Sequence, residues 1–321
     1  MNKKKTGLTV LIIIAIVALI STFSMISGNS QSAVKKSGPL ANIFQPFVQD
    51  EYIAELHLEG VIEDENKKYN QAWTLSTIDD IKNDSSNVAL AVFINSPGGG
   101  VYQADEVYLA LKNYKDETGR PIYVYQQSLA ASGGYYISMA ADKIFANRNT
   151  LTGSIGVISG TSVDCTGLLE KIGIKSKTIT AGKNKNMFNF NEPLTQEQKA
   201  IMQEIADECY QQFTQVICEN RKELTVEKVH ELADGRIYTA KQAKQHKLID
   251  EIGTTDDFYR ALRNEKLGGE DYEIVKFKYE KSPSLGEFLF DSITGKTNIE
   301  IPDELMPVSK IQYPAYMYTG F

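Results

Sequence analysis

Residues 121–142 read PIYVYQQSLAASGGYYISMAAD and place a strand, a corner and a helix in direct succession. The run IYVY favours a β-strand, whereas GGYYISMAAD suits a helix. Ser132 stands at the corner between them, with two alanines before it and two glycines after it. Neighbours this small let another group approach the serine closely. The corner therefore bears both on how the chain folds here and on where chemistry can take place.

Strand-like and helix-like segments alternate on both sides of this corner. They are residues 52–62 (strand), 74–84 (helix), 88–96 (strand), 101–117 (helix), 143–147 (strand), 151–159 (strand or turn), 194–222 (helix) and 225–233 (helix). The segment VALAVFINS at 88–96 is largely apolar, which is typical of a strand buried on both faces. Thr195 and Gln198 are placed to form a capping box at the start of the long helix. The alternation predicts a layered α/β fold.

The N-terminal residues have the pattern of a membrane anchor. Three lysines at 3–5 precede an uncharged apolar stretch at 8–27, and roughly 20 such residues cross a hydrocarbon layer. A signal-peptide core is shorter, although small residues at 30–33 leave a cleaved segment as the alternative. The lysines should remain in the cytoplasm. The expected organisation is a cytoplasmic N-terminus at 1–7, a transmembrane helix at 8–27, a linker at 28–50, a main domain at 51–269 and a C-terminal extension at 270–321.

Composition argues against several classes of function. The 321 residues are 42% apolar and 23% charged with a net charge of −7, which is a globular balance without the basic surface that binds nucleic acid. Cys209 and Cys218 would lie about 13 Å apart along one helix axis, too far for a disulfide. The chain has no Cys/His spacing suited to a metal and neither of the glycine motifs that cradle nucleotide phosphates. We therefore expect no metal, nucleotide or nucleic acid.

Ser132 permits two interpretations. Its setting, A-x-S-x-G at a strand-to-helix corner, resembles the nucleophile elbow of hydrolases, in which a tight turn exposes a serine hydroxyl. The first position departs from the usual G-x-S-x-G. Alternatively, the serine is an N-cap that accepts a hydrogen bond from the first turn of the following helix. The corner by itself favours the cap, because serine is a common cap residue.

A second glycine-rich stretch, FINSPGGGV at residues 93–101, directly follows a buried strand. It is either an ordinary glycine turn or a loop whose amides stabilise negative charge on a reacting oxygen. In the second case, the amide of Gly98 or Gly99 would combine with that of Gly133 to form an oxyanion hole. The two glycine-flanked stretches would then belong to one site.

A nucleophilic serine also needs a base. The chain has three histidines, which fall mid-strand or among charged helical residues and are better explained as structural or solvated: His57, His230 and His246. A lysine can replace histidine when its amine is uncharged, and an apolar pocket favours that form. Lys183 and Lys185 lie in AGKNKNMFNF at 181–190, among apolar and aromatic neighbours. A solvated surface loop is the other explanation of these lysines.

Four motifs resemble the bacterial signal peptide peptidase A family in its short, single-repeat form. They are NSPGGG at 95–100, AASGGYY at 130–136, TGSIGV at 152–157 and GKNKN at 182–186. The likeness extends from about Tyr52 to Gly253. It implies that Ser132 is the nucleophile, that Lys185 is the general base and that Ser154 orients the lysine amine. Lys183 remains a competitor, because the serine-to-lysine separation is slightly longer than the family's.

The resemblance also implies a fold and a substrate. The fold would be of the ClpP/crotonase type, built from stacked β-β-α units and assembled into a ring. The lysine would then be able to reach the serine of a neighbouring subunit. Substrates would be signal peptides left in the membrane after precursor processing, cut within their apolar segments, without ATP, metal or nucleotide.

Other functions stay open on the sequence. They are a membrane serine protease of the kind paired with stomatin-like proteins, a crotonase-fold acyl-CoA enzyme and a catalytically silent scaffold. The C-terminal stretch YPAYMYTGF at 313–321 is aromatic and nearly uncharged. It either occupies an apolar groove of its own chain, where it would be trimmed, or is an unstructured end.

Overall fold

The computed structural model describes residues 50–281 and 314–317. The expected anchor at 8–27 and nearly all of the expected linker lie outside these residues. Within the described ranges, no helix has the length and apolar character required to span a membrane. The description that follows therefore concerns the expected main domain and parts of the C-terminal extension.

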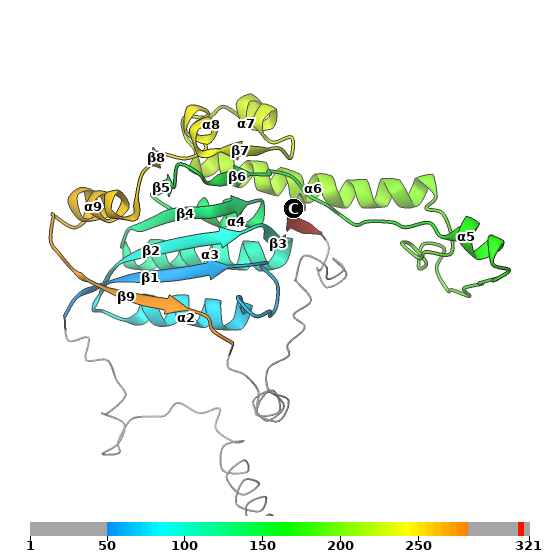
Figure 1. Ribbon diagram of the computed structural model, residues 1–321, viewed down its shortest axis with the longest axis horizontal. Helices are drawn as coiled ribbons and strands as arrows, with labels where there is room; N and C mark the ends of the chain where they lie inside the picture. Colours follow the sequence, from blue (N-terminus) through cyan, green and yellow to red (C-terminus); the bar gives the residue numbers. More distant parts are fainter. Residues whose placement is uncertain (1–49, 282–313, 318–321) are drawn as a thin grey trace, which may run out of the picture. The chain divides into compact units, whose positions relative to one another are not determined.

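The described residues form alternating strands and helices (Figure 1). In chain order these are β1 (Tyr52–Glu59), α2 (Gln71–Asn83), β2 (Asn87–Ser96), β3 (Gly98–Gly100), α3 (Val101–Thr118), β4 (Ile122–Ala131), α4 (Gly133–Ser138), β5 (Lys143–Ala146), β6 (Leu151–Gly153), α5 (Thr166–Lys171), α6 (Gln196–Asn220), α7 (Val226–Leu232), β7 (Ile237–Thr239), α8 (Ala240–Gln245), β8 (Glu251–Ile252), α9 (Thr255–Lys266), β9 (Glu273–Lys278) and β10 (Ala315–Met317).

The main sheet has the strand order β7-β6-β4-β2-β1-β9, and β5 pairs with both β4 and β8. Its ladders are parallel except for the antiparallel pairing of β6 with β7. Parallel neighbours require crossover connections, which place helices on the faces of the sheet. This arrangement confirms the predicted α/β fold class, and it aligns the carboxyl ends of β2 and β4, where the two glycine-rich stretches begin.

Each face of the sheet has its own hydrophobic core, because side chains alternate along a strand. On one face, Leu56, Val92 and Val124 pack with residues of α2, α3, α4 and α6. On the other face, Phe93 and Phe258 belong to an aromatic cluster covered by α9. Burial on both faces explains why residues 88–96 are largely apolar. It also gives the strand ends that carry the glycine loops a rigid base.

Two parts of the expected C-terminal extension pair with strands of the main domain. β9 runs parallel to β1, with Ile274 opposite Ile53. β10 runs antiparallel to β3, with Tyr316 opposite Gly99. The boundary expected at residue 269 therefore does not mark the end of the sheet.

Several local features follow their sequence signals. Thr195 and Gln198 form the predicted capping box at the start of α6. The helix expected at 74–84 begins earlier, at Gln71, because the Asn70 side chain accepts a hydrogen bond from the Trp73 amide. The three cysteines, Cys165, Cys209 and Cys218, are free, as expected for the pair on α6.

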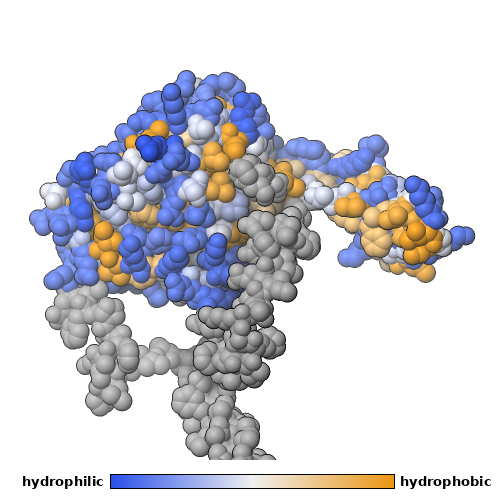
Figure 2. Space-filling model, in the orientation of Figure 1, coloured by the Kyte–Doolittle hydropathy of each residue, from blue (hydrophilic) through white to orange (hydrophobic). Residues whose placement is uncertain are grey.

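Residues 160–195, which include α5, lie beyond the first turns of α6 and away from the main sheet (Figure 1). We call this segment the arm. It exposes apolar side chains, seen as orange patches in Figure 2, and they include Val163, Leu168, Ile172, Ile174, Ile179 and Phe190. These side chains are left without cover by the chain itself.

Candidate active site

The corner between β4 and α4 holds Ser132 in an unusual backbone conformation, with φ 52° and ψ −114°. A non-glycine residue at positive φ is strained, typically by about 1–3 kcal/mol. Two hydrogen bonds hold it there. The Ser132 amide donates to the Gly153 carbonyl at 2.7 Å, and the Tyr136 amide donates to the Ser132 carbonyl at 2.8 Å. The corner is thus fixed by the adjacent strand β6 and by the first turn of α4.

The hydroxyl of Ser132 does not cap the helix. It makes no side-chain hydrogen bond to the first turn of α4, so the N-cap interpretation is wrong. The side chain is 1% exposed, and its Oγ has no hydrogen-bond partner among the described residues. Leaving a buried hydroxyl unpaired is unfavourable, and such exceptions call for an explanation. A hydroxyl held ready for a reaction provides one.

The loop at Gly98–Gly100 packs directly against the serine corner. A methyl group added at Gly98, where φ is +99°, would lie 2.6 Å from the Gly133 amide nitrogen. One added at Gly99 would lie 1.9 Å from the Ile62 carbonyl oxygen. Both positions therefore require glycine, and the fold brings together the three glycines that the sequence proposed for an oxyanion hole. The Gly98 amide donates to Ser96 Oγ at 3.0 Å.

The C-terminal strand β10 lies in this same site. It pairs with β3 on one side, and on the other Ala315 exchanges two backbone hydrogen bonds with Ile158, at 3.0 and 3.1 Å. The Tyr316 carbonyl oxygen would be 2.0 Å from a methyl group at Gly98 and 3.1 Å from one at Gly133. A backbone carbonyl thus sits between the two glycine segments. The segment at 313–321 was expected to occupy a groove of its own chain, and its described part, 314–317, does so; trimming remains a prediction.

Ser154 is brought close to the corner by strand pairing. β4 and β6 are parallel, with Ala131 opposite Gly153, so Ser132 and Ser154 are the next residues on neighbouring strands. Ser154 is buried and also has positive φ, at 50°. Its amide donates to the Arg236 carbonyl at 2.8 Å, which fixes it from the side opposite the serine corner.

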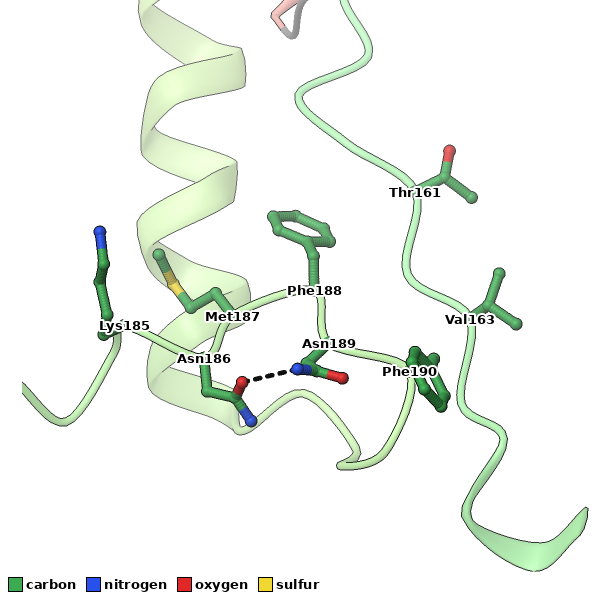
Figure 3. A pocket seen from close by; sticks show the side chains of 8 residues that line it. All are labelled: Thr161, Val163, Lys185, Asn186, Met187, Phe188, Asn189 and Phe190. Carbon is green, nitrogen blue, oxygen red and sulfur yellow. Dashed lines mark hydrogen bonds between the residues drawn. The ribbon is translucent and has the colours of Figure 1, made fainter. Parts of the chain in front are cut away.

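The two candidate lysines lie on the arm. Lys185 is exposed and borders an open cavity of about 480 Å³ together with Met187, Phe188 and Val163. Figure 3 shows the Lys185 amine and the Phe188 ring projecting to the same side of the loop. No hydrogen bond joins Lys185 to Ser132 within the part of the chain that the structure describes.

Lys183 has a different environment from Lys185. Its amine forms an ion pair with Glu197 at 2.8 Å. The hydrogen bond from Lys183 lowers the pKa of the Glu197 carboxyl. Sequence reasoning missed this carboxylate, because Glu197 lies in the first turn of α6 rather than in the loop. A carboxylate partner favours the charged form of Lys183 and makes it a poor base.

Comparison with known proteins now assigns the family. Residues 114–267 match Peptidase family S49. An Enterococcus faecium protein named as a signal peptide peptidase SppA is 34% identical over 283 residues, covering 84% of this chain and 81% of that protein. The chain belongs to peptidase family S49. It is therefore a serine peptidase, a hydrolase. The chloroplastic serine protease SPPA of Arabidopsis thaliana is also 34% identical, over 71% of this chain and 30% of that longer protein.

A solved structure is similar to this S49 peptidase as well. A ClpP1 mutant from Listeria monocytogenes covers 63% of this chain and 92% of its own, with 19% sequence identity and a TM-score of 0.43. The α/β fold class of the S49 chain rests on its own sheet and helices, described above. The stacked β-β-α units of the ClpP/crotonase type stay a prediction.

The histidines of this S49 peptidase have structural environments. His57, on β1, is hydrogen-bonded to Glu55 at 2.7 Å. Burial alone would raise the pKa of the Glu55 carboxyl, but hydrogen bonds from His57, Tyr259 and Lys276 outweigh it and lower the pKa to about 2. The other two histidine rings contact tyrosines on or near α7 and α8. Since Ser132 Oγ has no partner among the described residues, no histidine acts on it in this structure.

Proposed function

We propose that this S49 peptidase is an endopeptidase in which Ser132 is the nucleophile and Lys185 the general base. One observation carries the proposal. A peptide carbonyl, that of Tyr316, lies between Gly98 and Gly133, next in sequence to a buried serine hydroxyl without a hydrogen-bond partner. This is the arrangement that acyl transfer to a serine requires.

The reaction follows from these positions. Ser132 Oγ attacks the carbonyl carbon of the peptide bond as its proton passes to the uncharged amine of Lys185. The backbone amides hold the resulting oxyanion. The C–N bond then breaks, the leaving amine takes the proton from Lys185, and an ester with Ser132 remains. A water molecule, deprotonated by the same lysine, hydrolyses the ester and restores the serine.

The geometry divides the work among the glycines. The Gly98 amide is already engaged with Ser96 Oγ, so the amides of Gly99 and Gly133 are the better donors to the oxyanion. Gly98 contributes through its positive φ and its lack of a side chain, which leave room for the substrate carbonyl. Ser154, on the strand next to Ser132, orients the lysine amine.

The lysine is supplied by a neighbouring subunit of a ring in this proposal. Lys185 lies exposed on the arm, and Ser132 Oγ has no partner among the described residues of its own chain. The arm also exposes a row of apolar side chains that includes Leu168, Ile172 and Ile179. Burying them against a second copy would be favourable, and it would carry the loop at 182–190 to that copy. The peptidase of the ClpP/crotonase type is then active only when assembled.

The proposed substrates are apolar peptides in an extended conformation, in particular remnant signal peptides. The position of β10 supports this class, because an extended segment adds a strand between β3 and Ile158 through backbone hydrogen bonds. The relative from Enterococcus faecium carries the name of a signal peptide peptidase. We further propose that residues 8–27 anchor the chain in the cell membrane, with 1–7 in the cytoplasm and the peptidase domain outside.

The test is cleavage of a synthetic signal peptide by the purified full-length chain, compared with Ser132→Ala. We expect cleavage within the apolar segment by the unmodified chain and none by the variant. A serine-reactive phosphonate should label Ser132, which a silent scaffold would not permit. Binding of coenzyme A without peptide cleavage would overturn the proposal in favour of an acyl-CoA enzyme. Cleavage of membrane-protein segments but not of signal peptides would favour the stomatin-partner type.

A further inference from the structure

The side chain of Tyr316 occupies a defined pocket next to the catalytic corner. It is fully buried, although only residues 314–317 of its segment are described. Its ring stacks on that of Tyr136, with centroids 5.0 Å apart, and contacts the ring of Phe213 at 4.6 Å. Its hydroxyl donates a hydrogen bond to the Cys209 carbonyl at 2.8 Å. The pocket therefore provides two aromatic walls and one polar acceptor at its end.

The walls of this pocket are held in place by further hydrogen bonds. The Tyr136 hydroxyl donates to Asp105 at 2.6 Å and accepts from Gln212 at 3.1 Å. These bonds tie α4 to α3 and α6, the three helices around the pocket. Burial raises the pKa of the Tyr316 hydroxyl, so it keeps its proton and remains a donor. A rigid aromatic slot with a carbonyl acceptor matches a phenol better than an aliphatic side chain.

The position of the Tyr316 backbone relates this pocket to the reaction. Its carbonyl oxygen lies between Gly98 and Gly133, where the proposed function places the carbonyl that is attacked. A residue bound with its carbonyl there directs its side chain into the pocket of Tyr136 and Phe213. The pocket would thus read the residue on the acyl side of the bond that is cut.

We infer that the peptidase selects an aromatic residue, and tyrosine above all, on the acyl side of the cleaved bond. The specificity pocket consists of the rings of Tyr136 and Phe213 and the carbonyl of Cys209. This inference rests on the proposed function for the position of the cut, and it adds the chemical class of residue that is recognised. It also explains why the chain's own segment enters the site with Tyr316 rather than with the neighbouring Ala315 or Met317.

The experiment uses the full-length chain with Tyr316→Ala, so that its own tyrosine does not compete for the pocket. Quenched fluorescent peptides differ only in the residue before a methionine: tyrosine, phenylalanine, leucine or alanine. We expect kcat/KM for tyrosine to exceed that for phenylalanine by about 2–10-fold, the effect of one hydrogen bond. Phenylalanine should exceed alanine by about 10–100-fold, the effect of burying the ring.

A pocket variant and a matched control locate the effect. Phe213→Leu should lower the rates for the two aromatic peptides by about 10-fold and leave the alanine peptide within about twofold, because a stacking wall is lost. Phe258→Leu removes an equally buried ring on the opposite face of the sheet and should change all four rates alike. Equal rates for the four peptides, or equal losses in both variants, would overturn the inference.

Binding separates this inference from the proposed function. If no peptide, including a signal peptide, is cleaved, the proposed function fails. The ranking can still be measured by fluorescence anisotropy with the double variant Ser132→Ala and Tyr316→Ala. Tighter binding of tyrosine and phenylalanine peptides than of alanine peptides supports the pocket, and equal affinities contradict it.

Discussion

The serine corner and the lysine loop differ in almost every physical respect, although both belong to one proposed catalytic pair. Ser132 is buried, its backbone is held by two hydrogen bonds, and its neighbours at Gly98 and Gly133 leave no space for a side chain. Lys185 is exposed on an arm that packs little against the sheet. One chain thus completes the nucleophile and the oxyanion hole but leaves the base outside. The difference points to assembly as the step that completes the site.

The largest effect should come from the corner. Ser132→Ala removes the nucleophile and should lower kcat by about 10⁴-fold or more. Alanine at the same backbone conformation keeps the strain that serine already has, so the midpoint of thermal unfolding should change little. Peptide hydrolysis and a thermal melt of the same preparation measure both. Residual cleavage near the unmodified rate would show that another group attacks the peptide.

The lysine loop should respond next. Lys185→Ala should lower kcat by about 10²–10⁴-fold, the usual contribution of a general base. Lys183→Ala, the matched control from the same loop, should change it no more than a few-fold, because Lys183 is paired with Glu197. The reverse order of effects would exchange their roles.

A mixture of inactive subunits tests whether the base comes from a neighbour. Chains with Ser132→Ala still supply a lysine, and chains with Lys185→Ala still supply a serine. Co-assembly of the two should restore part of the activity that each lacks alone, and gel filtration should show the mixed particle. An inactive mixed ring would place both groups of the dyad in one chain.

The glycines at the two regions provide a matched pair of substitutions. Gly98→Ala should lower kcat by about 10²–10³-fold, because the added methyl group would lie 2.0 Å from the carbonyl bound at the site. Gly182→Ala on the lysine loop introduces a similar positive φ, +94°, but meets no atom within 4 Å. It should reduce stability modestly and leave most of the activity. Equal losses would mean that backbone strain, rather than the close approach, explains the Gly98 result.

The pH dependence should distinguish a lysine base from other bases. An amine accepts a proton only when it is uncharged, so below its pKa the rate should rise by up to about tenfold for each pH unit. Initial rates from pH 6 to pH 10, with circular dichroism at each pH as the control for folding, measure this rise. A rate that is constant across the range would argue against any lysine as the base.

The smallest effect concerns the chain's own C-terminal strand. Tyr316→Ala removes the ring that fills the pocket beside Tyr136 and Phe213, and substrates then face a weaker competitor. We expect kcat/KM for a short tyrosine peptide to rise a few-fold, without a change in kcat. Progress curves at low and high peptide concentration measure the two constants. An unchanged kcat/KM would indicate that the strand leaves the site before peptides bind.

The sequence predicted the features that depend on neighbours in the chain. Alternating apolar segments gave the α/β class, and Thr195 with Gln198 gave the capping box of α6. The corner at Ser132 was located from its small neighbours, but its two interpretations could not be separated. The structure decided between them, because the direction of a serine hydroxyl depends on φ and ψ at one residue, and strand β6 imposes those angles.

Residue order alone determined that a serine, a glycine loop and two lysines are present, since local turn chemistry and periodicity are written in short stretches. Tertiary structure decided which of them meet. Ser154 reaches the corner through the pairing of β4 with β6, Glu197 neutralises Lys183 across a helix start, and Tyr316 enters the site from more than 180 positions away. Such contacts depend on how distant segments pack and lose entropy together, which no short pattern records.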